Sequence, residues 1–189
     1  IFGYFFSLKV NACDKRLQNN FFTALFHDLP EALTRDIITP VKYCVDELSD
    51  IIAEYEIEKI EDDILPNVPE ILHDEFSYIL GLYDGIKEEF QNKIYEDKIQ
   101  IVDDISKYNS NKYNAIDGLA LKQCDKLSAF VEASLSISHG IKSKELISGK
   151  KEILKALKEV QGVDFKAIAT QIDYEFGTTG QTQARIDFD

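Results

Sequence analysis

An apolar stretch, Phe21 to Phe26, is followed at once by His27 and Asp28. Glu31 comes four residues after His27 and three after Asp28, spacings that bring side chains together on a helical turn. Neighbouring residues of a helix point about 100° apart, but at a helix end both side chains can reach one point. Imidazole and carboxylate groups bind divalent metal ions. The stretch can therefore supply two metal ligands and a nearby acid or base.

Two other positions in the chain, a second histidine-aspartate pair and Asp125, are further candidates for metal ligands. A second pair, His73–Asp74, lies in an acidic, amphipathic segment without a further matching motif, and we interpret it as a surface or packing pair. Asp125 lies in a segment rich in apolar residues, where an ionised carboxylate is costly unless it is paired or bound to a metal. The alternative is that Asp125 lies on the polar side of its helix, near Lys122 or Lys126.

The elements that must position these residues are predicted to be helical almost throughout, because apolar residues recur at intervals of three and four. We expect helices or helix-like amphipathic segments at 1–10, 15–29, 40–64, 68–83, 86–107, 115–138 and 143–161. The first two and the segment 115–138 are apolar enough to be core helices. The stretch "YNSNKYN" is predicted to be a polar loop, and "FGTTGQTQARIDFD" an extended tail.

Three residues are expected to end or begin these helices. Pro30 cannot donate a backbone hydrogen bond, so it should kink the helix or open a new turn after His27–Asp28. Pro40, with Thr39 as N-cap, should open the next helix, whose apolar stripe is Val41, Val45, Leu48, Ile51 and Ile52. Gly140 suits the C-terminal end of the helix that contains Asp125.

Composition narrows the class of protein. The chain has 189 residues and a net charge of −13, which disfavours nucleic-acid binding. No apolar run approaches the roughly 20 residues of a membrane span. Cys13, Cys44 and Cys124 form no CxxC motif, and three free thiols fit a cytoplasmic protein. The chain begins at Ile1 and lacks Met, so we expect it to be part of a longer protein.

The segment "ALFHDLPEALTRDIITPVKY", followed about a hundred residues later by "LKQCDKLSAFVEA", resembles the HD-domain metal-dependent phosphohydrolases. Within them it is most similar to the bacterial 5'-deoxynucleotidase group, and the similarity extends from the apolar opening to about Gly140. The resemblance implies an all-α, single-domain helical bundle over residues 1–163. Residues 164–189 would then be a C-terminal tail.

The resemblance also implies roles for individual residues. His27 and Asp28 are the central metal-binding pair of the family and Asp125 the last ligand. Glu31 would orient the attacking water or pass a proton to the leaving oxygen, and Asp36 would lie near the substrate, the alternative being that it caps a turn. By their charge alone, Arg35 and Lys42 are candidates for phosphate contacts, the alternative being that both are exposed to solvent. The family's first histidine has no counterpart between Ile1 and Phe26. We expect it upstream of Ile1; the alternative is a naturally degenerate site.

The implied activity is hydrolysis of (deoxy)nucleoside 5'-monophosphates with a divalent ion: Mn, Co, Fe, Ni, Mg or Zn. Alternative substrates are nucleoside triphosphates or cyclic nucleotides. The alternative from another class is a non-catalytic helical module for assembly or regulation. The expected partner is a small nucleotide, with neither nucleic acid nor membrane. Because family members often dimerise, a homodimer is a further expectation.

Overall fold

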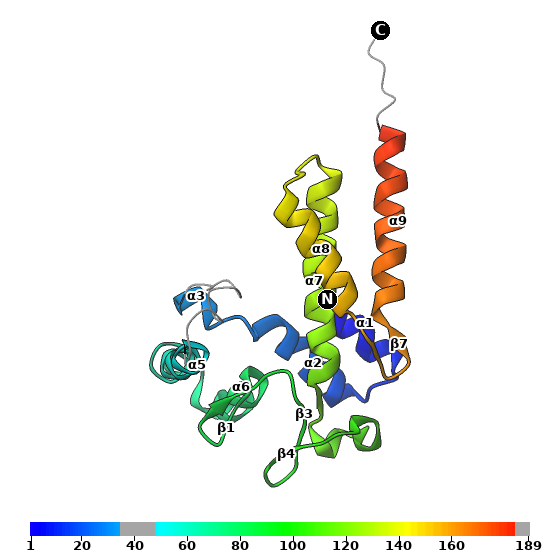
Figure 1. The fold of residues 1–189 in the computed structure, drawn as a ribbon. Helices are drawn as coiled ribbons and strands as arrows, with labels where there is room; N and C mark the ends of the chain where they lie inside the picture. Colours follow the sequence, from blue (N-terminus) through cyan, green and yellow to red (C-terminus); the bar gives the residue numbers. More distant parts are fainter. Residues whose placement is uncertain (35–47, 184–189) are drawn as a thin grey trace. The chain divides into compact units, whose positions relative to one another are not determined.

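The computed structural model describes residues 1–34 and 48–183. The chain divides into two compact units, one of Ala12–Gly118 together with Ile1, the other of Phe2–Asn11 and Leu119 onward. Figure 1 shows mainly helices, as predicted, and in addition several short antiparallel strands. The predicted boundary between a domain over 1–163 and a tail stays a prediction.

The first unit is built on α2 and on helices that follow it. Its helices are α2 (Asp14–Phe26), α3 (Glu31–Thr34), α5 (Leu48–Lys59) and α6 (His73–Leu80), with a π-helical turn at Ile60–Ile64 and 3-10 turns at Leu65–Asn67 and Glu70–Leu72. The predicted helix 40–64 is confirmed from Leu48 onward, while Pro40 and its Thr39 cap lie outside the described residues. Ile51 of the predicted apolar stripe is 59% exposed. The buried polar member of α5 is Glu56, which pairs with Lys87 at 2.9 Å.

The segment after α6 forms strands, so the helical prediction for 86–107 is wrong. Strand β1 (Leu82–Tyr83) pairs with β2 (Ile86–Lys87), and β3 (Asn92–Tyr95) lies between β4 (Ile99–Ile101) and β5 (Ile116–Asp117), all antiparallel. Further 3-10 turns lie at Ile105–Tyr108, at the end of the segment predicted to be helical, and at Asn111–Tyr113, within the predicted polar loop. Isoleucines favour a strand, and Ile94 packs with Ile105 and Ala115 in a small core.

The predicted helix 68–83 is shorter in the structure. The α-helix covers His73–Leu80 and ends at Gly81, whose φ is +83°. A Cβ at Gly81 would lie 2.7 Å from the backbone of Glu88 and Glu89, so only glycine allows β2 to return this closely. The chain therefore turns into β1 where the sequence pattern suggested one more helical turn.

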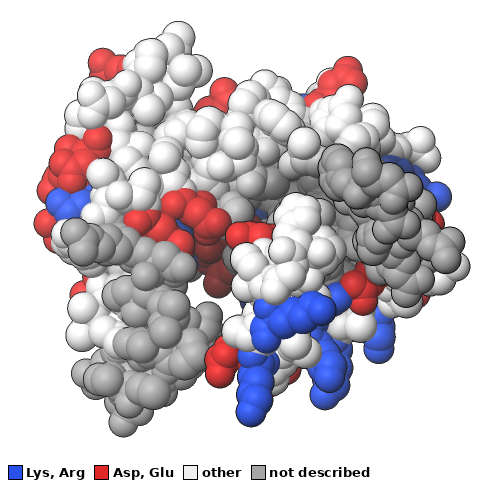
Figure 2. Space-filling model, turned by 90° about the horizontal axis from the view of Figure 1, so that it is seen from above, with Lys and Arg blue, Asp and Glu red and all other residues white. Residues whose placement is uncertain are grey.

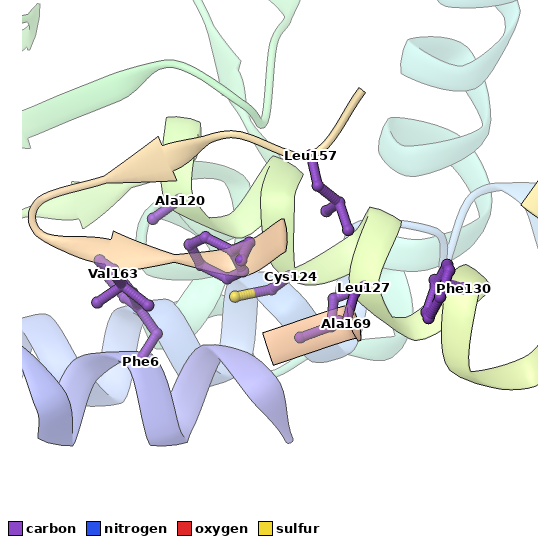
Figure 3. Packing of buried hydrophobic residues seen from close by; sticks show 9 residues of the cluster. Phe6, Ala120, Cys124, Leu127, Phe130, Leu157, Val163 and Ala169 are labelled. Atoms are coloured by element: carbon purple, nitrogen blue, oxygen red, sulfur yellow. The ribbon is translucent and has the colours of Figure 1, made fainter. Parts of the chain in front are cut away.

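The second unit packs three long helices with α1. Its elements are α1 (Phe2–Lys9), α7 (Gly118–Ser138), α8 (Lys144–Ala156), the β6–β7 hairpin (Glu159–Val160 and Val163–Asp164) and α9 (Phe165–Gln183). Figure 3 shows their shared core, in which Phe6, Cys124 and Leu127 are buried. Phe6 stacks on Phe165 with ring centroids 6.0 Å apart. Only one side of α1 is buried, since Phe5 is 59% exposed, so α1 is less of a core helix than predicted.

The end of α7 and the start of α8 follow the sequence, whereas α8 stops at Ala156 and the helical prediction for 157–161 is wrong. Gly140, with φ +95°, closes α7, and the Ile141 N–H donates to the Ser136 carbonyl at 3.0 Å. Ser143 caps α8 by accepting a hydrogen bond from the Leu146 N–H at 3.1 Å. The extended-tail prediction is wrong for 176–183, which continue α9, and residues 184–189 lie outside the described part. Packing of Ala169 in the core supports α9 and outweighs the weak helical pattern of its end.

Candidate metal centre

The end of α2 places His27 and Asp28 on an irregular turn. His27 is the C-cap of α2, and its N–H donates to the Thr23 carbonyl at 3.0 Å. The next backbone hydrogen bonds link residues three apart instead of four: the Leu29 N–H donates to the Phe26 carbonyl at 2.9 Å, and the Glu31 N–H to the Asp28 carbonyl at 3.0 Å. Pro30 then precedes α3. The prediction that Pro30 opens a new turn is confirmed.

On this turn the two side chains of the pair meet. His27 Nε2 lies 3.2 Å from Asp28 Oδ2, while the imidazole is 13% exposed and the carboxylate 64%. Two ligand atoms about 2.1 Å from one ion, at a right angle, are about 3 Å apart. The pair therefore fits two neighbouring positions around a divalent ion, with the carboxylate open to solvent.

The imidazole of His27 is supported by Phe90. Their ring centroids are 5.5 Å apart, with an interplanar angle of 64°. Phe90 comes close to the start of α7 because of Gly118, where an added Cβ would lie 2.2 Å from the Gln91 carbonyl oxygen and 2.4 Å from the Phe90 carbonyl carbon. Sequence analysis missed both residues. The available signal was a glycine at the start of an apolar helix.

A buried polar network holds α2 within the first unit. Asp117 accepts from Arg16 Nε at 2.7 Å, from Arg16 Nη2 at 2.5 Å and from Asn20 Nδ2 at 2.6 Å. Asn20 Oδ1 in turn accepts from the Asp117 N–H at 2.9 Å. The buried face of α2 is thus polar, formed by Arg16, Asn19, Asn20 and Thr23, and not by its phenylalanines. As predicted for a core helix, most of α2 is buried or half-buried, and its exposed residues are Asp14, Gln18 and Leu25.

Asp125 belongs to the second unit. It lies on α7 with an exposed side chain, so the argument that burial makes its charge costly does not hold. An exposed side chain fits a position on the polar side of the helix, and the role of Asp125 as a metal ligand stays a prediction. His27 and Asp28 are in the first unit, and their convergence with Asp125 on one ion stays a prediction.

The remaining predicted residues are placed in part. Glu31 is the first residue of α3 and is half-buried, and its catalytic role stays a prediction. Arg35, Asp36 and Lys42 lie outside the described residues.

The second histidine-aspartate pair has a different setting. His73 begins α6, and its Nε2 lies 2.8 Å from the Val68 carbonyl oxygen. Asp74 is exposed. The contact with Val68 fits a packing role for His73, and that interpretation stays a prediction.

Comparison with known proteins assigns the family. The model of the HD domain matches residues 1–154. The chain belongs to the HD domain family. Such domains are in general metal-dependent phosphohydrolases that bind divalent ions, which agrees with the His27–Asp28 geometry. The searches of curated proteins and of solved structures found no match. Within the described residues, no helix combines the length and apolarity needed to cross a membrane.

Proposed function

We propose that this HD-domain protein hydrolyses (deoxy)nucleoside 5'-monophosphates to a nucleoside and inorganic phosphate. The observation that carries the proposal is the contact between His27 Nε2 and Asp28 Oδ2 at 3.2 Å, on the turn that leads into Glu31. Family membership supports phosphohydrolase chemistry in general. The choice of a 5'-monophosphate rests on the motif resemblance of residues 24–43.

His27, Asp28 and Asp125 are the residues that would hold the ion. Nitrogen and oxygen donors together suit Mn, Co, Fe, Ni or Zn, and Mg is a further candidate. When bound, the ion supplies a water of lowered pKa and polarises the phosphoryl oxygens. The largely buried imidazole, in contact with Phe90, fixes one donor, whereas the exposed Asp28 carboxylate can adjust to the substrate.

Glu31 would move the proton. As water oxygen bonds to phosphorus and the bond from phosphorus to the 5'-oxygen breaks, the Glu31 carboxylate takes a proton from the water and delivers it to the leaving oxygen. Groups of this kind contribute about 10²–10⁴-fold to turnover. Arg35 and Lys42 would contact the phosphate and Asp36 the nucleoside. Local positive charge is needed because the chain as a whole carries −13.

The test is phosphate release by the full-length protein, loaded in turn with Mn, Co and Mg. The panel contains nucleoside and deoxynucleoside 5'-monophosphates, the matching triphosphates and the 3',5'-cyclic nucleotides. We expect release from the monophosphates and a loss of release on chelation. Turnover of triphosphates or cyclic nucleotides alone would contradict the substrate proposal. Metal binding without turnover of any member would favour the non-catalytic module.

A further inference from the structure

The second unit contains a cavity among α7, α8 and α9. Its volume is about 380 Å³, within the range of roughly 300–1,000 Å³ typical of small-molecule sites. Apolar side chains line it, among them Phe130 of α7 and Ile147 and Leu154 of α8. Phe130 is fully buried and belongs to the core of the unit. The cavity thus offers an apolar surface on a well-packed base.

Lysines surround this apolar surface. Lys142 and Lys151 line the cavity with exposed side chains, and in the part of the chain that the structure describes neither has an ion-pair partner. Lys150 is paired with Asp173, and its Nζ lies 5.2 Å from the centre of the Phe130 ring. Two unneutralised ammonium groups therefore stand beside an apolar cavity, and a third is balanced by a carboxylate.

The charge of this segment differs in sign from that of the chain. Residues 142–158 hold six lysines against two glutamates, a net charge of +4, whereas the whole chain carries −13. Figure 2 shows Lys and Arg side chains gathered together on the face that it presents. Such a local reversal attracts anions and repels cations.

We propose that this cavity binds an amphiphilic organic anion, with its carboxylate or phosphate between Lys142 and Lys151 and its apolar body against Phe130, Ile147 and Leu154. Two other lysines of α8, Lys144 and Lys155, are also exposed but do not line the cavity. The proposal concerns the second unit alone and does not depend on the proposed phosphohydrolase activity.

Octanoate is a suitable probe, because it joins a carboxylate to an apolar chain. Octan-1-ol keeps the chain without the charge, and acetate keeps the charge without the chain. In titration calorimetry of the full-length protein we expect octanoate to bind at least about 10-fold more tightly than either control. If octanoate and octan-1-ol bind with similar affinity, the proposed role of the lysines is wrong. If octanoate and acetate bind with similar affinity, the proposed role of the apolar cavity is wrong.

Three substitutions locate the site. Lys151→Gln should weaken octanoate binding by about 5-fold, the upper range for one exposed ionic contact. The matched control, Lys155→Gln, makes the same charge change one turn further on and should have no effect. Asp173→Asn should tighten binding by a similar factor, because it frees Lys150.

Equal losses in the two lysine variants would contradict a discrete site. They would indicate a diffuse basic surface. In that case, binding to vesicles that contain phosphatidylserine in phosphatidylcholine, without binding to pure phosphatidylcholine vesicles, would identify a membrane as the partner. Selective loss with Lys151→Gln, without vesicle binding, supports the cavity.

Discussion

Replacing Asp117 by alanine removes the acceptor of three buried hydrogen bonds, two from Arg16 and one from Asn20. The Arg16 side chain is 2% exposed and the Asp117 side chain 0%, so water cannot replace the lost carboxylate. The guanidinium would be left buried without its counter-charge.

The expected cost is large for this reason. Breaking a buried ion pair by removing one partner typically costs about 3–5 kcal/mol, against a total stability of about 5–15 kcal/mol for a native protein. We expect Asp117→Ala to lower the free energy of unfolding of the first unit by about 3–5 kcal/mol. Adding Arg16→Met removes the stranded charge, so the double variant should recover part of this loss.

Hydrogen exchange of the α2 amides is the appropriate assay, because it reports on the first unit and not on a mixture of both. The matched control is Glu96→Gln, which breaks the exposed pair with Lys112 at 3.7 Å and should cost less than about 1 kcal/mol. If Asp117→Ala costs no more than Glu96→Gln, the buried network does not hold α2. Strict additivity of Asp117→Ala and Arg16→Met would refute the coupling.

Three further predictions concern pH, catalysis and packing. Burial lowers the pKa of Lys93 to about 8 from 10.5, so from about pH 8 to 10 the unfolded chain holds a proton that the folded chain lacks. The free energy of unfolding, measured in urea, should therefore rise with pH in this range, by at most about 1.4 kcal/mol per pH unit. The Lys93→Met variant should flatten this rise. Above pH 10 the raised pKa of Tyr78 opposes this trend. Glu31→Gln should lower kcat for phosphate release by about 10²–10⁴-fold with metal content unchanged; a lower melting temperature with unchanged kcat would instead make Glu31 a structural residue of the turn. The Gly118→Ala substitution should lower the free energy of unfolding by at least about 1–3 kcal/mol and weaken metal binding, because the added methyl group shifts Phe90. The control Gly149→Ala, at a position with open space, should have neither effect.

Local signals predicted much of the helical framework. Pro30 and Gly140 mark real ends, and Ser143 opens α8, because each acts on hydrogen bonds within a few residues of itself. The His27–Asp28 contact was also foreseeable, since a helix end releases neighbouring side chains from the fixed angle between them.

Long-range partners explain what the sequence could not reveal. The spacing of a buried stripe is present in α2 at Arg16, Asn19 and Asn20, but from the sequence alone these polar side chains are expected to face solvent. Their partner Asp117 lies about a hundred residues away and comes next to them only in the folded chain. Lys93 likewise suggests an exposed helix, yet it is fully buried in β3, with its Nζ 5.2 Å from the centre of the Tyr78 ring. Charged residues at such positions are satisfied by tertiary contacts that no local pattern encodes.

The most direct test of the account uses the two histidine-aspartate pairs of the chain as a matched comparison. Full-length wild-type protein, the His27→Ala/Asp28→Ala variant and the His73→Ala/Asp74→Ala variant are loaded with Mn or Co, and bound metal is measured by mass spectrometry alongside circular dichroism. The account predicts that the first variant loses its metal while remaining folded and that the second keeps it. Metal retained by the first variant, or lost from a folded second variant, would contradict the assignment of the metal centre to the turn at the end of α2.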